Sequence, residues 1–256
     1  IYNEYMIKKS PNFLIIGAAR SGTTTLYNCL KKHPLIYLPK NKRPEPHFFL
    51  KNKEFKKGYE YYIGKYFFNS SLNQIKGEAS TSYLFQKYVP SRIYKYIPNC
   101  KFIIMLRNPV ERAISNYLFT YNNGIETLDF DKAIRNENKR IKNPKNIFEK
   151  EVQPFAYLKR GLYYNQISNY LKYFKRKQFH FIIFDNFILN PNRELKAVLE
   201  FLNLNQIRFQ NIRRFNKSKI KIKVSKETKK FMINYFKDDI NKLSNFLNKD
   251  LRTWLN

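Results

Sequence analysis

Apolar runs alternate with amphipathic segments along this chain. Residues 13–16, 101–106 and 179–184 are short apolar runs of the length expected for buried strands. Each is followed by residues whose apolar side chains recur every three or four positions, as on one face of a helix. The alternation predicts an α/β fold with a mainly parallel central sheet flanked by helices. No repeat or linker interrupts it, so we expect one domain over residues 1–256.

Local signals predict the remaining elements. A short strand is expected at 35–38, and residues 75–83 predict a strand end followed by a turn. The three prolines of residues 39–47 predict a loop. The polar stretch 122–153 predicts a mobile insertion of helix and loop, and 205–224 is basic without periodicity. Helices are predicted at 23–32, 90–96, from 109, at 162–174, from 190 and at 226–247, the last with Phe231 and Tyr235 buried.

A tight loop of small residues follows the first strand. Residues 17–22 are Gly-Ala-Ala-Arg-Ser-Gly, and three threonines then open the next helix. A strand, glycine loop and helix N-terminus present backbone N–H groups and a positive dipole end to an anion. The glycines have Walker A spacing, but Thr23 replaces the lysine and Arg107 stands where a Mg²⁺-binding carboxylate would end a strand. The loop therefore predicts an anionic nucleotide bound without Mg²⁺, which argues against a kinase or ATPase.

A second anion site is predicted after residues 101–106. If a helix starts near Pro109, then Asn108, Arg112 and Ser115 share one face. Arg107 can fork onto a phosphate, and Ser115 can add a hydroxyl donor. The alternative is that Arg107 pairs with Glu111 and that Ser115 is a surface residue. Since both loops follow strands of one sheet, a nucleotide with two separated anionic groups is the more attractive interpretation.

The charge of the chain is strongly positive. Lys and Arg number 49 against 19 Asp and Glu, giving a formal net charge of +30. Such a field favours capture of an anionic substrate and is compatible with a polyanionic partner. The alternative is compositional drift, because Lys, Asn, Ile, Tyr and Phe are favoured throughout. No RNA- or DNA-binding motif occurs and the basic residues are spread, so we expect no nucleic-acid partner.

Cysteine content and hydropathy indicate where in the cell the protein is expected. Cys29 and Cys100 form no CxxC or Cys/His cluster, so neither a metal site nor a disulfide framework is predicted. A reducing, cytoplasmic location is expected. No apolar run approaches the roughly 18–20 residues that span a bilayer. The chain begins with Ile1, which leaves an upstream leader or membrane anchor open.

Taken together, the motifs resemble the sulfotransferases that use 3′-phosphoadenosine 5′-phosphosulfate (PAPS). Residues 19–25 resemble the 5′-phosphosulfate loop of that family, and residues 102–117 resemble its 3′-phosphate motif. Within that family the chain most resembles the heparan sulfate and related bacterial carbohydrate sulfotransferases, over roughly residues 13–204 and more weakly over the C-terminal helix. Further motifs stand in the order of that branch at residues 44–49, 77–83, 161–166 and 201–204.

The resemblance implies a cofactor site for PAPS, with adenosine 3′,5′-bisphosphate (PAP) as product and no metal. Arg20 matches a catalytic Lys or Arg that stabilises charge on the bridging oxygen, and Arg107 and Ser115 would hold the 3′-phosphate. Lys217 and Lys219 are candidates to close over the phosphates. The 5′-phosphosulfate would be held by Arg20, Ser21, Gly22, Thr23, Thr24 and Thr25.

The resemblance also implies a general base for the acceptor. Glu45 matches the glutamate that removes the acceptor proton, which requires a partly buried carboxylate. Taken alone, Glu45 is a solvated loop residue among cations, and His47 is the alternative base or a group that steadies the sulfate. Ala79 stands where the heparan branch often has a second active-site lysine, which puts a heparan-like acceptor in doubt.

The expected acceptor is a hydroxyl of a carbohydrate or another small hydroxylated molecule, anionic ones included. A secondary-metabolite alcohol or an amine is an alternative acceptor. Two alternatives belong to other functional classes: a P-loop nucleotide kinase or ATPase, and a non-enzymatic polyanion or nucleic-acid binder.

Overall fold

A computed structural model gives the fold and describes residues 8–39, 45–210, 212 and 222–256. Lys217 and Lys219 lie outside the described residues. The chain divides into two compact units. The sheet unit comprises Ile1–Leu106 and Asn169–Asn216, and the helical unit comprises Arg107–Ser168 and Lys217–Asn256. Each unit is described separately below.

The sheet unit is built on five parallel strands. Their order is β2-β3-β1-β4-β5, so β1 is central and successive strands are added on both of its sides. This confirms the predicted α/β fold class with a parallel sheet. The strands are β1 (Phe13–Gly17), β2 (Ile36–Tyr37), β3 (Ile75–Ala79), β4 (Lys101–Leu106) and β5 (Phe179–Ile183).

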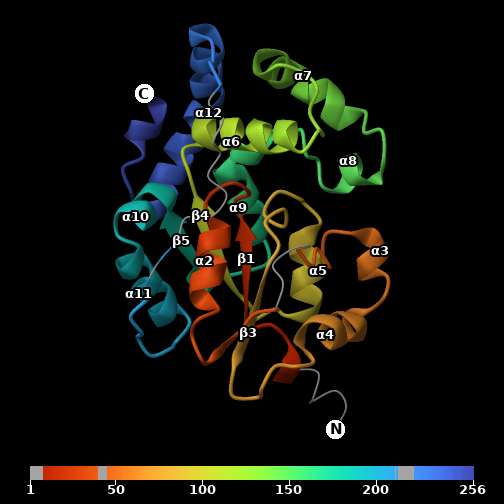
Figure 1. Cartoon of the computed structure of the whole chain (residues 1–256), viewed down its shortest axis with the longest axis vertical. Coiled ribbons are helices and arrows are strands. Elements are labelled where there is room, and N and C mark those ends of the chain that lie inside the picture. Colours follow the sequence, from red (N-terminus) through yellow and green to blue (C-terminus); the bar gives the residue numbers. More distant parts are fainter. Residues whose placement is uncertain (1–7, 40–44, 211, 213–221) are drawn as a thin grey trace. The chain divides into compact units, whose positions relative to one another are not determined.

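Apolar side chains on both faces explain why these segments form a covered sheet. All five residues of β1 are buried, which is typical of a parallel strand with helices on both sides. One face packs on α2 (Thr23–Leu30), α10 (Phe184–Leu189) and α11 (Pro191–Phe201), through residues such as Leu26 and Leu199. Figure 1 shows α2 running alongside β1. On the other face Phe102 contacts the ring of Tyr170, at the end of α9 (Tyr163–Leu171).

The aromatic-rich segment after β2 forms a cluster. Phe48 stacks on Tyr62 with ring centroids 4.5 Å apart, and Phe49 meets the edge of Tyr62 at 5.4 Å. These rings hold α3 (Asn52–Phe55) and α4 (Tyr59–Phe67) together, and α5 (Val89–Tyr96) joins them because Tyr96 stacks on Tyr59. The segment is therefore part of the hydrophobic interior.

The helical unit contains the elements that follow β4 and precede the C-terminus. Its long helix, α12 (Lys226–Leu247), begins at the Ser225 N-cap and buries Met232, Phe236 and Ile240. Phe231 was predicted to be buried but is about half exposed, because it lies one position away from that stripe. The other elements of this unit are α6 (Pro109–Asn122), α7 (Phe130–Lys142), α8 (Ile147–Glu151), η1 (Lys159–Gly161), the start of α9, and η3 (Arg252–Leu255).

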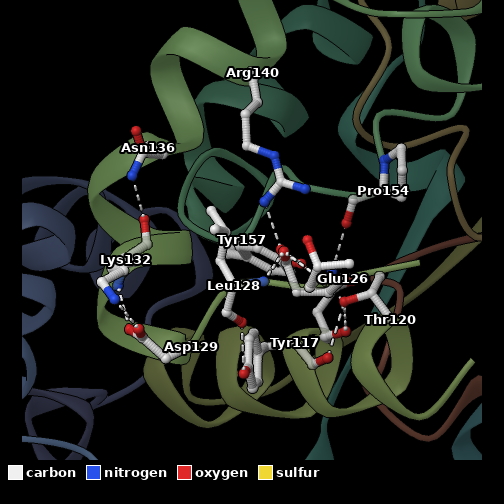
Figure 2. A network of polar contacts seen from close by, with 12 residues as sticks. Tyr117, Thr120, Glu126, Leu128, Asp129, Lys132, Asn136, Arg140, Pro154 and Tyr157 are labelled. Carbon is white, nitrogen blue, oxygen red and sulfur yellow. Dashed lines mark hydrogen bonds and ion pairs between the residues drawn. The ribbon is translucent and has the colours of Figure 1, made fainter. Parts of the chain in front are cut away.

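A buried polar network organises the region predicted as an insertion. Figure 2 shows the Glu126 carboxylate between Arg140 and Tyr157, which donate to it at 2.6 and 2.7 Å. Thr120 and Tyr157 share a further hydrogen bond of 2.8 Å. Glu137 is buried as well and accepts the backbone N–H groups of Leu158 and Lys159. The polar residues of this region therefore include interior anchors as well as exposed charges.

Candidate functional site

The loop between β1 and α2 needs its second glycine. Gly22 is the N-cap of α2 and has a left-handed backbone, with φ of 89°. A Cβ at this position would lie 2.9 Å from the Phe184 ring. Gly22 supplies no side-chain cap, and the first turn of α2 has no acidic residue. The helix therefore begins with a positive dipole end that no carboxylate of its own first turn neutralises.

The predicted cofactor-binding residues line this loop and the start of α2. Ser21 is fully buried, and its Oγ has no hydrogen-bond partner within the described residues. Thr23 and Thr25 are buried, whereas Thr24 is half-buried. Arg20 is half-buried and has φ of 69°, an uncommon conformation for a residue with a side chain. A residue with this backbone conformation, in a loop for which anion binding is predicted, is a functional candidate.

Glu45 is a held carboxylate and not a solvated loop residue. Its side chain is 16% exposed. The backbone N–H of Thr81 donates to Oε2 at 2.9 Å, and the Thr81 hydroxyl bonds Oε1 at 3.0 Å. His47 Nε2 also lies 2.9 Å from Oε2. The two sequence-predicted base candidates are therefore hydrogen-bonded to each other.

The turn after β3 connects this pair to the end of β1, where the loop before α2 begins. Ser80 donates its N–H to Ile15 at 3.1 Å, and Leu84 donates to Ile16 at 3.0 Å, so the turn extends the pairing of β3 with β1. The Thr81 carbonyl oxygen lies 3.4 Å from the Cβ position of Gly17. Because Thr81 binds Glu45, the carboxylate is held by a turn that is hydrogen-bonded to Ile16, the residue before Gly17.

A second carboxyl, Glu78, lies on β3, three residues before Thr81. It was not identified as a site residue from the sequence. It is fully buried, and burial raises its pKa to about 7. Neither carboxyl oxygen has a hydrogen-bond partner of standard geometry within the described part of the chain. Interactions with the hydroxyls of Tyr83, Tyr62 and Ser80 nevertheless lower the pKa of Glu78, while the negative charge of Glu45 raises this pKa. The preceding aromatic cluster is the sequence signal that explains its burial.

Arg107 and Ser115 belong to the helical unit. Arg107 directly follows β4, and Tyr163 donates its hydroxyl to the Arg107 carbonyl at 2.8 Å. Its guanidinium pairs with Glu111 at 3.3 Å, which is the alternative considered from the sequence. Both of these side chains keep some exposure, and such a pair is weak enough to be exchanged for a phosphate. Ser115 lies in the second turn of α6, where it is half-buried.

The helix after Arg107 starts as predicted. The Asn108 side chain accepts the N–H groups of Val110 and Glu111, and Pro109 is the first helical residue. Arg112, expected on the face of Ser115, is fully buried and donates to the Tyr157 carbonyl. Its Nε and Nη1 have no hydrogen-bond partner within the described residues. Arg112 therefore anchors α6 inside the helical unit.

Comparisons with known proteins agree on one family. A family model described as "Sulfotransferase domain" matches residues 10–253, which include parts of both units. Heparan sulfate glucosamine 3-O-sulfotransferase 5 of Mus musculus is 31% identical over 199 residues, covering 78% of this chain and 55% of the relative. The chain thus spans about half the length of the curated relatives of this kind.

Solved structures give the same answer for the fold. A sulfotransferase from Alicyclobacillus acidocaldarius superposes with a TM-score of 0.82 at 29% identity, covering 96% of this chain and 99% of that one. The mouse sulfotransferase SULT7A1, solved with PAP, has a TM-score of 0.50 at 16% identity over 76% of this chain and 59% of its own, a likeness of fold alone. Among the described residues, no helix is both long and apolar enough to cross a membrane.

Proposed function

Because the chain belongs to the sulfotransferase family, we propose that it transfers a sulfuryl group from PAPS to a hydroxyl of a carbohydrate or another small hydroxylated acceptor. The relative that acts on heparan sulfate supports a carbohydrate acceptor. A sulfotransferase of the same fold was solved with PAP, the product expected from PAPS. Amines and secondary-metabolite alcohols remain the alternative acceptors, because Ala79 replaces a lysine of the heparan branch.

The observation that carries the proposal is the held Glu45 carboxylate. Thr81 bonds both of its oxygens, and the same turn is hydrogen-bonded to Ile16, directly before the loop that starts at Gly17. A carboxylate fixed beside an anion-binding loop is suited to remove a proton from an acceptor hydroxyl. His47 steadies Glu45 through the Nε2 contact, or serves as the base itself.

The other residues bind and polarise the donor. The N-terminus of α2 and the hydroxyls of Ser21, Thr23, Thr24 and Thr25 would bind the 5′-phosphosulfate. Arg20 would stabilise the negative charge that grows on the bridging oxygen as the sulfur–oxygen bond breaks. Arg107 and Ser115 would bind the 3′-phosphate. The acceptor oxygen attacks sulfur in line, its proton passes to Glu45, and PAP leaves, so positioning and electrostatics supply most of the acceleration.

The base is tested by Glu45→Gln. Loss of a general base typically costs about 10²–10⁴-fold in rate. Turnover of PAPS labelled with ³⁵S should fall by that factor across an acceptor panel, while the calorimetric affinity for PAP stays within about 2-fold. Glu60→Gln, which changes an exposed glutamate of α4, is the matched control. Undiminished turnover would transfer the base role to His47 or to the acceptor itself.

The cofactor site is tested by Arg107→Ala in buffer containing EDTA. Loss of a charge-assisted contact should weaken PAP binding by about 10–100-fold. Arg135→Ala removes an exposed arginine of the same unit and should leave PAP affinity unchanged. ATP with Mg²⁺ should not compete. Equal PAP affinity in the Arg107 variant and the parent protein would contradict the two-anion nucleotide site.

A further inference from the structure

Two hydroxyls hold the backbone of the segment that carries the base candidates. Ser80 Oγ accepts the N–H of His47 at 3.0 Å, and the Tyr83 hydroxyl accepts the N–H of Phe49 at 3.2 Å. His47 has φ of 51°, so its conformation depends on such outside contacts. These two bonds therefore help to fix where the Glu45–His47 pair stands.

Each of these hydroxyls still has its own proton to donate. A hydroxyl has one donor and two acceptor sites, so accepting an N–H leaves the O–H proton in need of a partner. The Ser80 and Tyr83 hydroxyls both interact with the carboxyl of Glu78 and lower its pKa. Glu78 is fully buried on β3, directly before the turn, and neither of its oxygens has a hydrogen-bond partner of standard geometry within the described residues.

We propose that Glu78 is a positioning residue for the general base. It draws the protons of Ser80 and Tyr83 toward itself, so that the lone pairs of these hydroxyls face the N–H groups of His47 and Phe49. Through them it holds Glu45 in place without touching substrate. The inference rests on the proposed function only in giving Glu45 the role of base.

The protonation state of Glu78 changes how well it can do this. An ionised carboxyl accepts from both hydroxyls, whereas a protonated one uses one oxygen as a donor. Burial raises the Glu78 pKa to about 7, with the Glu45 charge acting in the same direction. The orienting effect is therefore strongest above pH 7. The titratable groups that interact with Glu78 are Glu45, Tyr27, Tyr59, Tyr62, Tyr66, Tyr83 and Cys100.

The first test compares the pH dependence of kcat in the parent protein and in Glu78→Gln. The parent kcat should rise through about pH 7, the pH at which Glu78 ionises. The Gln variant should lose this rise and fall about 10-fold below the parent at pH 8, while KM for PAPS stays within about 2-fold. Glu137→Gln is the matched control, since that carboxyl is also buried with a pKa raised to about 7. An unchanged pH profile in Glu78→Gln overturns the proposal.

The second test needs no turnover. Hydrogen exchange of the His47 and Phe49 amides should be about 10-fold faster in Glu78→Gln and unchanged in Glu137→Gln. If Glu78→Gln does not fold, Ser80→Ala carries the test, because it removes the acceptor for His47 and should speed exchange at that amide alone. Faster exchange without detectable sulfuryl transfer would sink the proposed function but not the positioning role. Unchanged exchange in a folded variant overturns the role.

Discussion

At the scale of single residues, Gly22 offers the sharpest test of the phosphate loop. Gly22→Ala puts a Cβ at φ of 89° and 2.9 Å from Phe184. Backbone strain and overpacking together should lower the free energy of unfolding by about 2–4 kcal/mol. Gly124→Ala is the control, because Gly124 also has a positive φ but open space around its Cβ position, so only the strain of about 1–2 kcal/mol applies.

Urea unfolding of the two glycine variants measures these costs, and calorimetry with PAP measures the effect on binding. We expect Gly22→Ala to lose PAP affinity and Gly124→Ala to keep it. Equal stability losses in both variants would mean that the Phe184 ring moves aside without cost.

A second residue-scale prediction concerns Glu111, which would compete with the proposed nucleotide for the Arg107 guanidinium. Glu111 pairs with Arg107 at 3.3 Å and is itself exposed. Glu111→Gln should therefore free the guanidinium and raise PAP affinity. An exposed pair is worth about 0–1 kcal/mol, so the gain should be at most about 5-fold. Titration calorimetry at low salt measures it, and weaker binding in Glu111→Gln would mean that the carboxylate helps to orient Arg107.

Residue identities allowed a candidate site to be proposed only where the residues concerned are close together in the sequence. Arg20, Gly22 and the threonines are readable because a glycine loop before a helix has a known use. Glu45 alone was indistinguishable from a solvated loop residue, since its partner Thr81 lies 36 positions away. Glu78 was not identified because the aromatic side chains that interact with it, such as Tyr27, Tyr62 and Tyr83, come from three separate segments. Long-range pairing of this kind leaves no periodic signal.

At the scale of elements, we expect the N-cap of α6 to link helix stability to the proposed nucleotide site. Asn108→Ala removes the acceptor for two N–H groups and should cost about 1 kcal/mol. Asn146→Ala removes the corresponding cap of α8, which accepts from Glu149, and is the matched control. Only Asn108→Ala should also weaken PAP binding, because Arg107 is its neighbour in sequence. Thermal unfolding and calorimetry separate the two effects, and equal PAP affinity in both variants would refute the link.

Most elements were predictable because their signals are local. Strands β1 and β4 are continuous apolar runs, and α6 and α12 have caps as well as stripes. The short helix α10 was missed, since Phe184 ends the apolar run of β5 and reads as strand. The order of the strands could not be predicted, because it depends on contacts between segments about 60 to 90 residues apart.

At the scale of the whole molecule, two buried carboxyls set a pH dependence of stability. Burial raises the pKa of both Glu78 and Glu137 from 4.5 to about 7. Between these values the folded state binds more protons than the unfolded state, so the free energy of unfolding falls as the pH rises from about 4.5 to about 7. Glu126, whose pKa is lowered, acts in the opposite direction only at lower pH.

Urea unfolding at several pH values between 5 and 7.5 measures this decline. Glu78→Gln should remove on the order of 2–3 kcal/mol of it, and Glu137→Gln should remove a comparable part. A decline as steep in both variants as in the parent protein would show that other groups cause it.

The position of the single tryptophan has a spectroscopic consequence. Trp254 is buried in the helical unit, where its ring meets the edge of Tyr163 at 6.3 Å. Selective excitation of indole fluorescence therefore monitors the helical unit, while the circular dichroism of the backbone monitors the whole chain. Tyr163 donates to the carbonyl of Arg107 and also contacts the Trp254 ring. A nucleotide that binds at Arg107 is therefore expected to change the fluorescence of Trp254. The natural sequence thus contains an intrinsic reporter, and label-free emission titrations need no engineered chromophore.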